Sequence, residues 1–146
     1  MPKDDIERTF PGLAAIGFRI TSPASWVYNC AAWAAAETHR WWDPSSEGGY
    51  YWPPHTLAAQ SLAALVAAFS TLGYEKCVDA RHEPGATKLA LYADANGLPT
   101  HVARQLPSGA WTSKLGASED IEHSTLEGLE GALYGRVVQC LRRTLA

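Results

Sequence analysis

Cys30 and His101 are the two residues of this chain whose types and settings predict chemistry. Cys30 precedes an alanine-rich run, residues 31–36, which contains no Gly or Pro and predicts a helix. His101 lies in an alternating stretch, residues 99–106, that predicts a strand. A thiol at a helix start and an imidazole on a later strand are the two halves of a cysteine nucleophile site, in which the imidazole takes the thiol proton.

The residue before the cysteine strengthens this interpretation. Asn29 is a favoured helix cap, which places Cys30 in the first helical turn. There the unpaired backbone N–H groups and the helix dipole favour a thiolate over a thiol. We therefore expect the pKa of the Cys30 thiol to be lowered and this residue to be the nucleophile.

The composition bounds the fold and the class of partner. The chain has 146 residues, of which 47% are hydrophobic and 18% charged, so we expect one ordered domain, residues 1–146, with its own core. The net charge is −3 and no basic run occurs, which argues against binding to nucleic acid.

The termini and the cysteines predict where the protein works. Acidic residues stand near the N-terminus, where a secretory signal would have an apolar run. The longest apolar segment, residues 57–69, is interrupted by Gln60 and Ser61 and is too short to span a bilayer. Three cysteines form neither a disulfide framework nor a zinc pattern. We expect a cytoplasmic protein with no membrane contact, metal or organic cofactor, and leave export by a dedicated secretion system open.

Helices are expected in the first half of the chain and strands in the second. Residues 1–21 predict an irregular or partly helical lead-in, and residues 40–54 an aromatic loop rich in Gly and Pro. Helices are predicted over 30–39 and 56–72, and the strand candidates are 74–79, 88–92, 99–106, 110–115 and, with a helix as the alternative, 134–141. This order predicts an α+β fold in which N-terminal helices pack on an antiparallel β-meander.

Three strings of this chain, YNCAA at 28–32, PGATKLALY at 84–92 and HVARQLPSGAW at 101–111, resemble the papain-like cysteine peptidases, in particular the NlpC-type branch of bacterial cell-wall endopeptidases. In that family Asp-Cys-Ser-Gly follows an aromatic residue at a helix start, and the similar string here is YNCAA at 28–32. The family's Pro-Gly-Asp-Leu strand start is similar to PGATKLALY at 84–92, and its His-Val-Gly-Ile-Tyr strand is similar to HVARQLPSGAW at 101–111. The resemblance covers about residues 26–39 and 84–116.

The resemblance implies a papain-like core and a thiol hydrolase of amide or peptide bonds. Cys30 would attack the carbonyl, His101 would accept and return the proton, and Ser113 falls where the family's third polar residue lies. The residues around the nucleophile, Tyr28, Asn29 and Trp33, are expected to bind the substrate, which would be a peptide, a peptidoglycan-like polymer or a protein.

Departures from the family pattern keep two alternatives open. Asn29 replaces the family's Asp, Ala31 and Ala32 replace its Ser-Gly, and the Ser113 hydroxyl cannot stabilise an imidazolium as a carboxylate does. The first alternative is a papain-like module that only binds a partner protein. The second is a delivered toxin or effector that uses the same chemistry for deamidation, transfer or peptidoglycan cleavage.

One further histidine is a reserve candidate for the site, and the other two cysteines are predicted to be structural. His123 is the reserve candidate for the residue that orients His101, because the segment before it can fold back over the site. Cys77 and Cys140 lie in apolar strand candidates without a helix start or a partner histidine, so both are expected to be structural.

Overall fold

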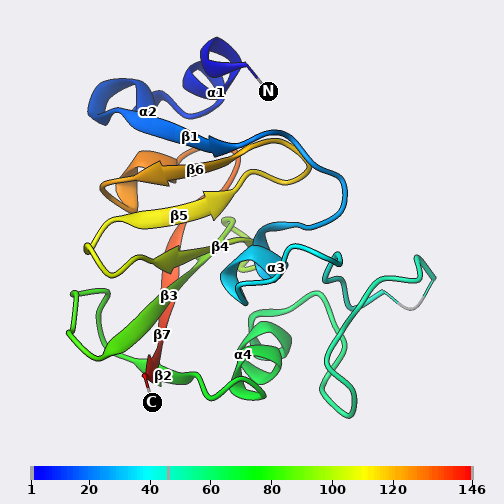
Figure 1. The fold of residues 1–146 in the computed structure, drawn as a ribbon. Coiled ribbons are helices and arrows are strands. Elements are labelled where there is room, and N and C mark those ends of the chain that lie inside the picture. The colour runs from blue at the N-terminus through cyan, green and yellow to red at the C-terminus, as the bar shows by residue number, and fades with distance from the viewer. Residues whose placement is uncertain (1, 46, 146) are drawn as a thin grey trace.

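A seven-stranded antiparallel sheet forms the centre of the computed structural model, which describes residues 2–45 and 47–145 (Figure 1). Its strand order is β1-β6-β5-β4-β3-β7-β2. The strands are β1 (Phe18–Ser22), β2 (Glu75–Cys77), β3 (Ala86–Ala93), β4 (Pro99–Gln105), β5 (Trp111–Lys114), β6 (Asp120–His123) and β7 (Arg136–Thr144). The predicted α+β class and antiparallel meander are confirmed, because β3, β4, β5 and β6 are neighbours in chain order.

Two pairs of short helices cover different parts of this sheet (Figure 1). The helices α1 and α2 lie beside β1 at one end of the sheet, α3 packs on the central strands β4 and β5, and α4 contacts β2 at the opposite edge. Their bounds are α1 (Lys3–Thr9), α2 (Pro11–Ile16), α3 (Cys30–Ala34) and α4 (Leu62–Ser70), and a single 3-10 turn, η1, spans Glu127–Leu129. Among the described residues, no helix has the length and apolar character that crossing a membrane requires.

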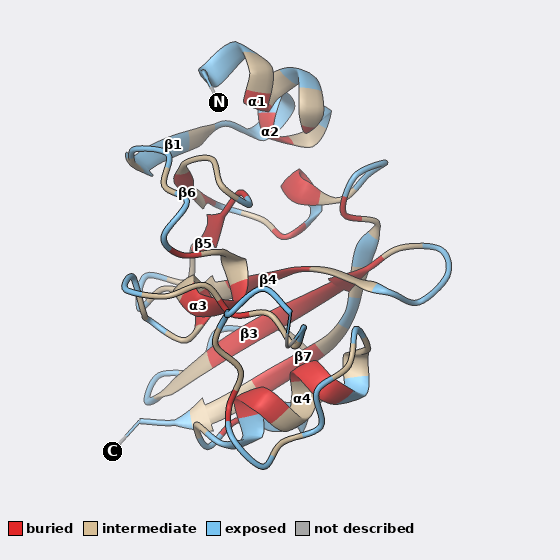
Figure 2. Ribbon diagram, turned by 90° about the vertical axis from the view of Figure 1, so that its right-hand side faces the viewer, coloured by how far each residue is buried: buried red, intermediate tan, exposed pale blue. Residues whose placement is uncertain are grey.

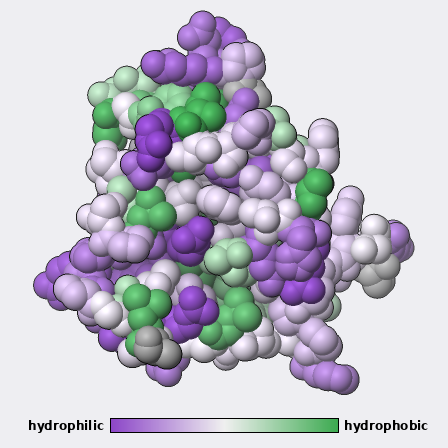
Figure 3. Space-filling model, viewed as in Figure 1, coloured by the Kyte–Doolittle hydropathy of each residue, from purple (hydrophilic) through white to green (hydrophobic). Residues whose placement is uncertain are grey.

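The sheet separates two hydrophobic clusters, as expected for strands whose successive side chains alternate between faces. Leu89, Leu91 and Val102 belong to the cluster that packs against α3 and α4. Ala90 and Ala103, their neighbours in the sequence, belong to the cluster that packs against α1, α2 and η1. We call these the α3 face and the α1 face. Figure 2 shows the buried central strands between the helices, and Figure 3 shows hydrophilic and hydrophobic side chains intermixed on one side of the surface.

The predicted helices are shorter than expected for local reasons. The helix α3 ends at Ala34 rather than at residue 39, and Ala36 has a positive φ of 62° that a continuing helix does not allow. The helix α4 begins at Leu62 rather than at residue 56, because the Ser61 side chain accepts a hydrogen bond from the backbone N–H of Ala64.

Two strands of the sheet, β1 and β6, do not correspond to any predicted strand. The lead-in contains β1, whose residues are mostly exposed and therefore lack the apolar alternation that indicates a strand. The segment 120–123, for which no strand is predicted, forms β6, which pairs with both β1 and β5. The uncertain last element is a strand, β7, which pairs with β3 and β2.

Candidate functional site

Asn29 fixes the position of Cys30 at the start of α3. The Asn29 Oδ1 accepts the backbone N–H of Ala32 at 3.2 Å, so the predicted helix cap is confirmed. The same amide joins α3 to the following loop, since Oδ1 accepts the N–H of Trp42 at 3.1 Å and Nδ2 donates to its carbonyl at 2.7 Å. Cys30 is therefore the first residue of a helix that is anchored at its start.

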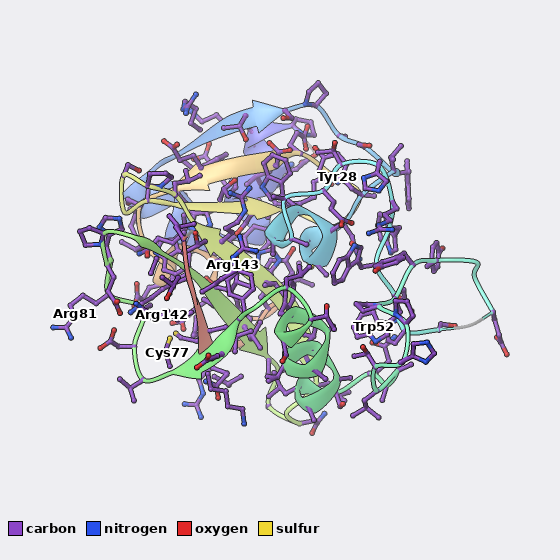
Figure 4. The ribbon with its side chains drawn as sticks, turned by 60° about the horizontal axis from the view of Figure 1, so that its bottom comes forward. Tyr28, Trp52, Cys77, Arg81, Arg142 and Arg143 are labelled. Carbon is purple, nitrogen blue, oxygen red and sulfur yellow. The ribbon has the colours of Figure 1, made fainter. Side chains whose placement is uncertain are left out.

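A pocket of about 120 Å³ lies at this helix start. Cys30 and Asn29 line it together with parts of the loop between α3 and α4 and the beginning of β4, which includes His101. Trp52, labelled in Figure 4, lies on that loop and forms one wall of the pocket. The other lining residues that matter below are Trp42, Asp43, Ala59 and Gln60. The sequence-predicted nucleophile thus borders an opening on the molecular surface.

The environment of the thiol does not favour the thiolate. Burial raises the pKa of Cys30, and this effect outweighs hydrogen bonding to the backbone N–H groups of Val102 and Ala31 and the positive charge of Lys114. The expectation of a lowered pKa is therefore wrong, since α3 spans five residues and its start is desolvated. The resting form of this cysteine at neutral pH is the thiol.

His101 occupies the predicted strand, β4, but its ring lies on the α1 face. It pairs across the strands with Tyr92, and its ring stacks on Tyr134 with a centroid distance of 4.3 Å and an angle of 6°. Only 2% of the residue is exposed, and neither ring nitrogen has a hydrogen-bond partner. Burial, with a smaller effect from the nearby His123, lowers the pKa of His101 to about 3, so the imidazole is neutral.

The expected contact between thiol and imidazole is therefore not formed. The next residue along β4, Val102, points toward α3, and its backbone N–H is the group that approaches the Cys30 sulfur. Because side chains alternate along a strand, His101 then points away from α3. The sequence predicts the helix start and the strand correctly, but it does not reveal which face of the strand the helix covers.

Ser113 lies on the same face as His101 but interacts with another histidine. It is fully buried on β5, and its Oγ lies 2.8 Å from His123 Nε2. His123 Nδ1 lies 2.8 Å from the carbonyl oxygen of Thr125, which can only accept, so Nδ1 carries the proton and Nε2 accepts from the serine hydroxyl. The expected bond between Ser113 and His101 is absent, and His123, the reserve candidate, is the partner of Ser113 instead.

The Ser113–His123 pair has the geometry of a hydroxyl beside a base but lacks access. Ser113 exposes none of its surface and His123 only 2%. Burial lowers the pKa of His123 as well, and the bond to Thr125 opposes this shift only in part. With no opening to the hydroxyl, the pair links β5, β6 and the turn after β6 rather than meeting a substrate.

Of the three expected substrate-binding residues, only Asn29 lines the pocket. Trp33 donates from Nε1 to Thr112 Oγ1 at 2.9 Å, which fixes α3 on β5. Tyr28 donates to Asp120 Oδ2 at 2.5 Å, and burial, followed by this bond, raises the pKa of Tyr28 to about 12. Tyr28 and Trp33 therefore attach α3 to the sheet.

A buried charged network beside α3 was not anticipated. The Lys114 ammonium donates to the carbonyls of Ser25 and Gly116 at 2.8 and 2.6 Å and lies 4.7 Å from the centre of the Tyr28 ring. Asp120, fully buried, accepts from Tyr28 and from Thr21. The adjacent polar residues of the sequence gave no sign of burial, because charged residues are usually exposed.

The geometry defines an α+β protein with a seven-stranded antiparallel sheet and a thiol-bearing pocket at a helix start. The chain belongs to the DUF7689 family, a domain of unknown function, whose model matches residues 19–142. No curated protein and no solved structure matches the chain. Within the described part of the chain, no group of three or more His, Cys, Asp or Glu residues is placed to hold a metal ion.

Proposed function

We propose that the chain is a binding module that receives one apolar side chain of a peptide or protein partner in the pocket at Cys30. The observation that carries this proposal is that Cys30 and His101 both line the pocket, yet the buried imidazole stacks on Tyr134 and neither of its nitrogens has a hydrogen-bond partner. A thiol without an adjacent base is a weak nucleophile, whereas the pocket itself needs no proton transfer.

The size of the pocket selects the class of ligand. Its volume of about 120 Å³ is somewhat less than the roughly 150 Å³ of an engineered cavity that takes up benzene. It therefore fits one branched aliphatic or small aromatic side chain and is too small for a nucleotide or another organic cofactor. A peptide would place a single side chain in the pocket and lie across its rim.

The walls of the pocket favour an apolar occupant. The indole N–H groups of both tryptophans are already used, since Trp42 Nε1 donates to Glu37 at 2.8 Å and Trp52 Nε1 donates to the Leu57 carbonyl at 2.9 Å. The ring of Trp52, which is partly exposed, consequently presents apolar surface to a ligand, whereas Trp42 is almost wholly buried. Asp43 and Gln60 line the same pocket, and Asp43 accepts the N–H of Ser45 at 2.8 Å. These polar groups can bind the ligand backbone.

Peptide binding is tested with peptides in which one central position is varied among Ala, Val, Leu, Phe, Lys and Asp. Ala59 lines the pocket, and the neighbouring Ala58 is exposed. Ala59→Phe should fill the pocket and abolish binding of the Val, Leu and Phe peptides, while the matched Ala58→Phe variant retains it. Binding unaffected by Ala59→Phe, or equal for apolar and charged central residues, would refute this function.

The second candidate function is a papain-like thiol hydrolase with Cys30 as nucleophile and His101 as base, including a delivered effector that acts on protein or peptidoglycan. The specific observation that favours it is the position of Cys30 as the first residue of α3, with backbone N–H groups around the sulfur. Turnover would require the His101 ring to leave Tyr134 and reach the pocket. Cleavage of the peptides above, abolished by Cys30→Ala and by His101→Ala, would establish this candidate and replace the binding module.

A further inference from the structure

The edge of the sheet brings two cysteines together that lie far apart in the sequence. Strand β2 pairs with β7 in the register that sets Cys77 directly opposite Cys140, and neither cysteine is in a disulfide, although the Cys77 thiol donates to the Asp79 carbonyl at 3.4 Å. Directly opposite residues of antiparallel strands have Cα atoms about 4.5–5.5 Å apart and project to the same face. Both values lie within the range of about 4.4–6.8 Å that disulfides span.

The surroundings give a reagent access to this pair. A cleft of about 340 Å³ is lined by both cysteines, and Cys77 is half-buried whereas Cys140 is buried. Burial raises the pKa of each thiol, and the ammonium of Lys88 opposes that shift at both. The next residue after Cys77, Val78, is fully exposed, so the strand ends in solvent. Figure 4 shows Cys77 at this end of the sheet.

We propose that Cys77 and Cys140 form a covalent modification site at which a small-molecule disulfide of the glutathione class generates an intramolecular disulfide. The Cys77 thiolate attacks the reagent, forms a mixed disulfide and releases one reagent thiol. The Cys140 thiolate then attacks the Cys77 sulfur and releases the second. Two protein thiols lose two protons and two electrons, and the reagent is reduced to two thiols.

The more exposed cysteine reacts first, and the opposite one resolves the mixed disulfide. Cys30 takes no part, because it lies at the start of α3 and pairs with neither strand. The new bond would join the three-residue edge strand β2 covalently to β7, whose other side is held by β3. The inference rests on strand register alone and is independent of the function proposed for the pocket.

The test is incubation of the folded protein with oxidised glutathione, followed by acid quenching and peptide mapping without reduction. We expect a linked peptide pair containing Cys77 and Cys140, with the loss of two hydrogens, and the same link in Cys30→Ser. In Cys140→Ser the reaction should stop with one glutathione on Cys77. Wild-type protein that stays reduced, that retains glutathione on Cys77, or that links Cys30 instead would overturn the proposal.

A separate observation concerns two arginines on the α3 face. Arg104 of β4 and Arg143 of β7 both line a cavity of about 420 Å³, and no described carboxylate forms an ion pair with either. Each arginine donates one N–H to a backbone carbonyl: Arg104 Nε donates to Trp33 at 3.3 Å, and Arg143 Nη1 donates to Leu72 at 3.2 Å. The remaining guanidinium donors are available to a ligand.

The two guanidinium groups are held over aromatic rings. Arg104 Cζ lies 5.3 Å from the centre of the Trp33 ring and Arg143 Cζ 4.6 Å from that of Tyr74. Glu83 also lines the cavity, but it is engaged by Lys88 at 3.2 Å and by Arg142 at 2.9 Å. Partly buried guanidinium groups without a counter-charge are costly, and an oxyanion between them relieves that cost.

We infer that this cavity binds a phosphate group. The probe is inorganic phosphate, titrated against the isotope-labelled protein while the arginine Nε–H signals are followed by NMR. We expect saturable shifts at Arg104 and Arg143 and at least about a tenfold weaker affinity in Arg104→Gln and Arg143→Gln. Arg136→Gln removes the same charge from an exposed position outside the cavity and should leave binding unchanged. No saturable shift, or equal weakening in all three variants, would overturn the inference.

Discussion

The two faces of the sheet differ: one carries a reactive side chain that a ligand can reach, and the other carries a hydrogen-bonded serine–histidine pair that a ligand cannot reach. On the α3 face, Cys30 borders a pocket, but neither ring nitrogen of His101, a residue that also lines this pocket, forms a hydrogen bond. On the α1 face, Ser113 donates to His123 at 2.8 Å, yet the pair is sealed from solvent. A reactive residue type therefore indicates a functional site only where the surface and a matched partner coincide. If the buried histidines stabilise the fold while the pocket carries the function, substitutions on the α1 face should reduce stability more than substitutions at the pocket.

The largest effect is expected for His123→Ala on the α1 face. The substitution removes a buried ring and leaves the hydroxyl of Ser113 and the carbonyl of Thr125 without their partner, which should lower the free energy of unfolding by about 3–4 kcal/mol. Urea denaturation of the variant and the wild type measures this loss. The matched control is His82→Ala at an exposed loop position, which should change stability by less than about 0.5 kcal/mol. A loss as small as that of the control would contradict a structural role for His123.

The next effect is a pH dependence caused by His101. Its pKa is lowered from 6.5 to about 3 in the folded chain, so below pH 6.5 the unfolded state binds a proton that the folded state does not. The contribution of His101 to the free energy of unfolding is fully present above pH 6.5 and is lost as the pH falls toward 3. The loss is about 2.7 kcal/mol over the first two pH units.

Denaturation series at several pH values measure this slope. His101→Leu should remove its own part of the slope, while His82→Ala leaves the slope unchanged. A slope that is identical in wild type and His101→Leu would show that the imidazole is already charged, or already solvated, in the folded protein.

A smaller loss is expected for Ser113→Ala. The variant loses one hydroxyl and leaves His123 Nε2 without a donor, at a cost of about 1–2 kcal/mol. Ser113→Thr keeps the hydroxyl but adds a methyl group at a fully buried position, so it is not a neutral control. The control is Ser108→Ala in the exposed turn between β4 and β5, where stability should be unchanged within about 0.5 kcal/mol. Equal changes in the free energy of unfolding for Ser113→Ala and Ser108→Ala would show that the hydrogen bond of Ser113 to His123 does not stabilise the fold.

The sequence predicted the elements of the site better than their relative orientation. The Asn29 cap, the helix start at Cys30 and the strand of His101 follow from local preferences, and the structure confirms them. The face on which α3 packs depends on contacts between distant segments, such as Trp33 with Thr112. Successive side chains of β4 point to opposite faces, so Val102 instead of His101 faces α3. The strand is therefore predicted correctly, but the predicted pairing of Cys30 with His101 is not formed.

The strands β1 and β6 and the buried charged residues could not be predicted from local sequence patterns. Strand β1 is mostly exposed and β6 has polar residues at most positions, so neither shows the apolar alternation of a strand. Lys114 and Asp120 look like surface residues in the sequence, and only tertiary contacts bury them. The opposition of Cys77 and Cys140 likewise requires the register between β2 and β7, which local pattern does not contain.

The smallest stability effect belongs to Cys30 itself. Cys30→Ala removes one half-buried sulfur beside a pocket, so the free energy of unfolding should fall by no more than about 1 kcal/mol. Thermal or urea unfolding measures this change. A loss comparable to that of His123→Ala would place Cys30 in the core and weaken its assignment to the pocket.

The most direct measurement is the rate of Cys30 alkylation by iodoacetamide as a function of pH, in wild type and in His101→Leu, with peptide mapping to separate Cys30 from Cys77 and Cys140. We predict a single titration with a pKa above the ordinary value of 9.0 for a thiol, and the same profile in both proteins, because burial raises the pKa of the thiol and the His101 imidazole forms no hydrogen bond with it. A fast plateau at neutral or acidic pH that disappears in His101→Leu would reveal a thiolate–imidazolium pair and contradict the assignment of Cys30 to a binding pocket.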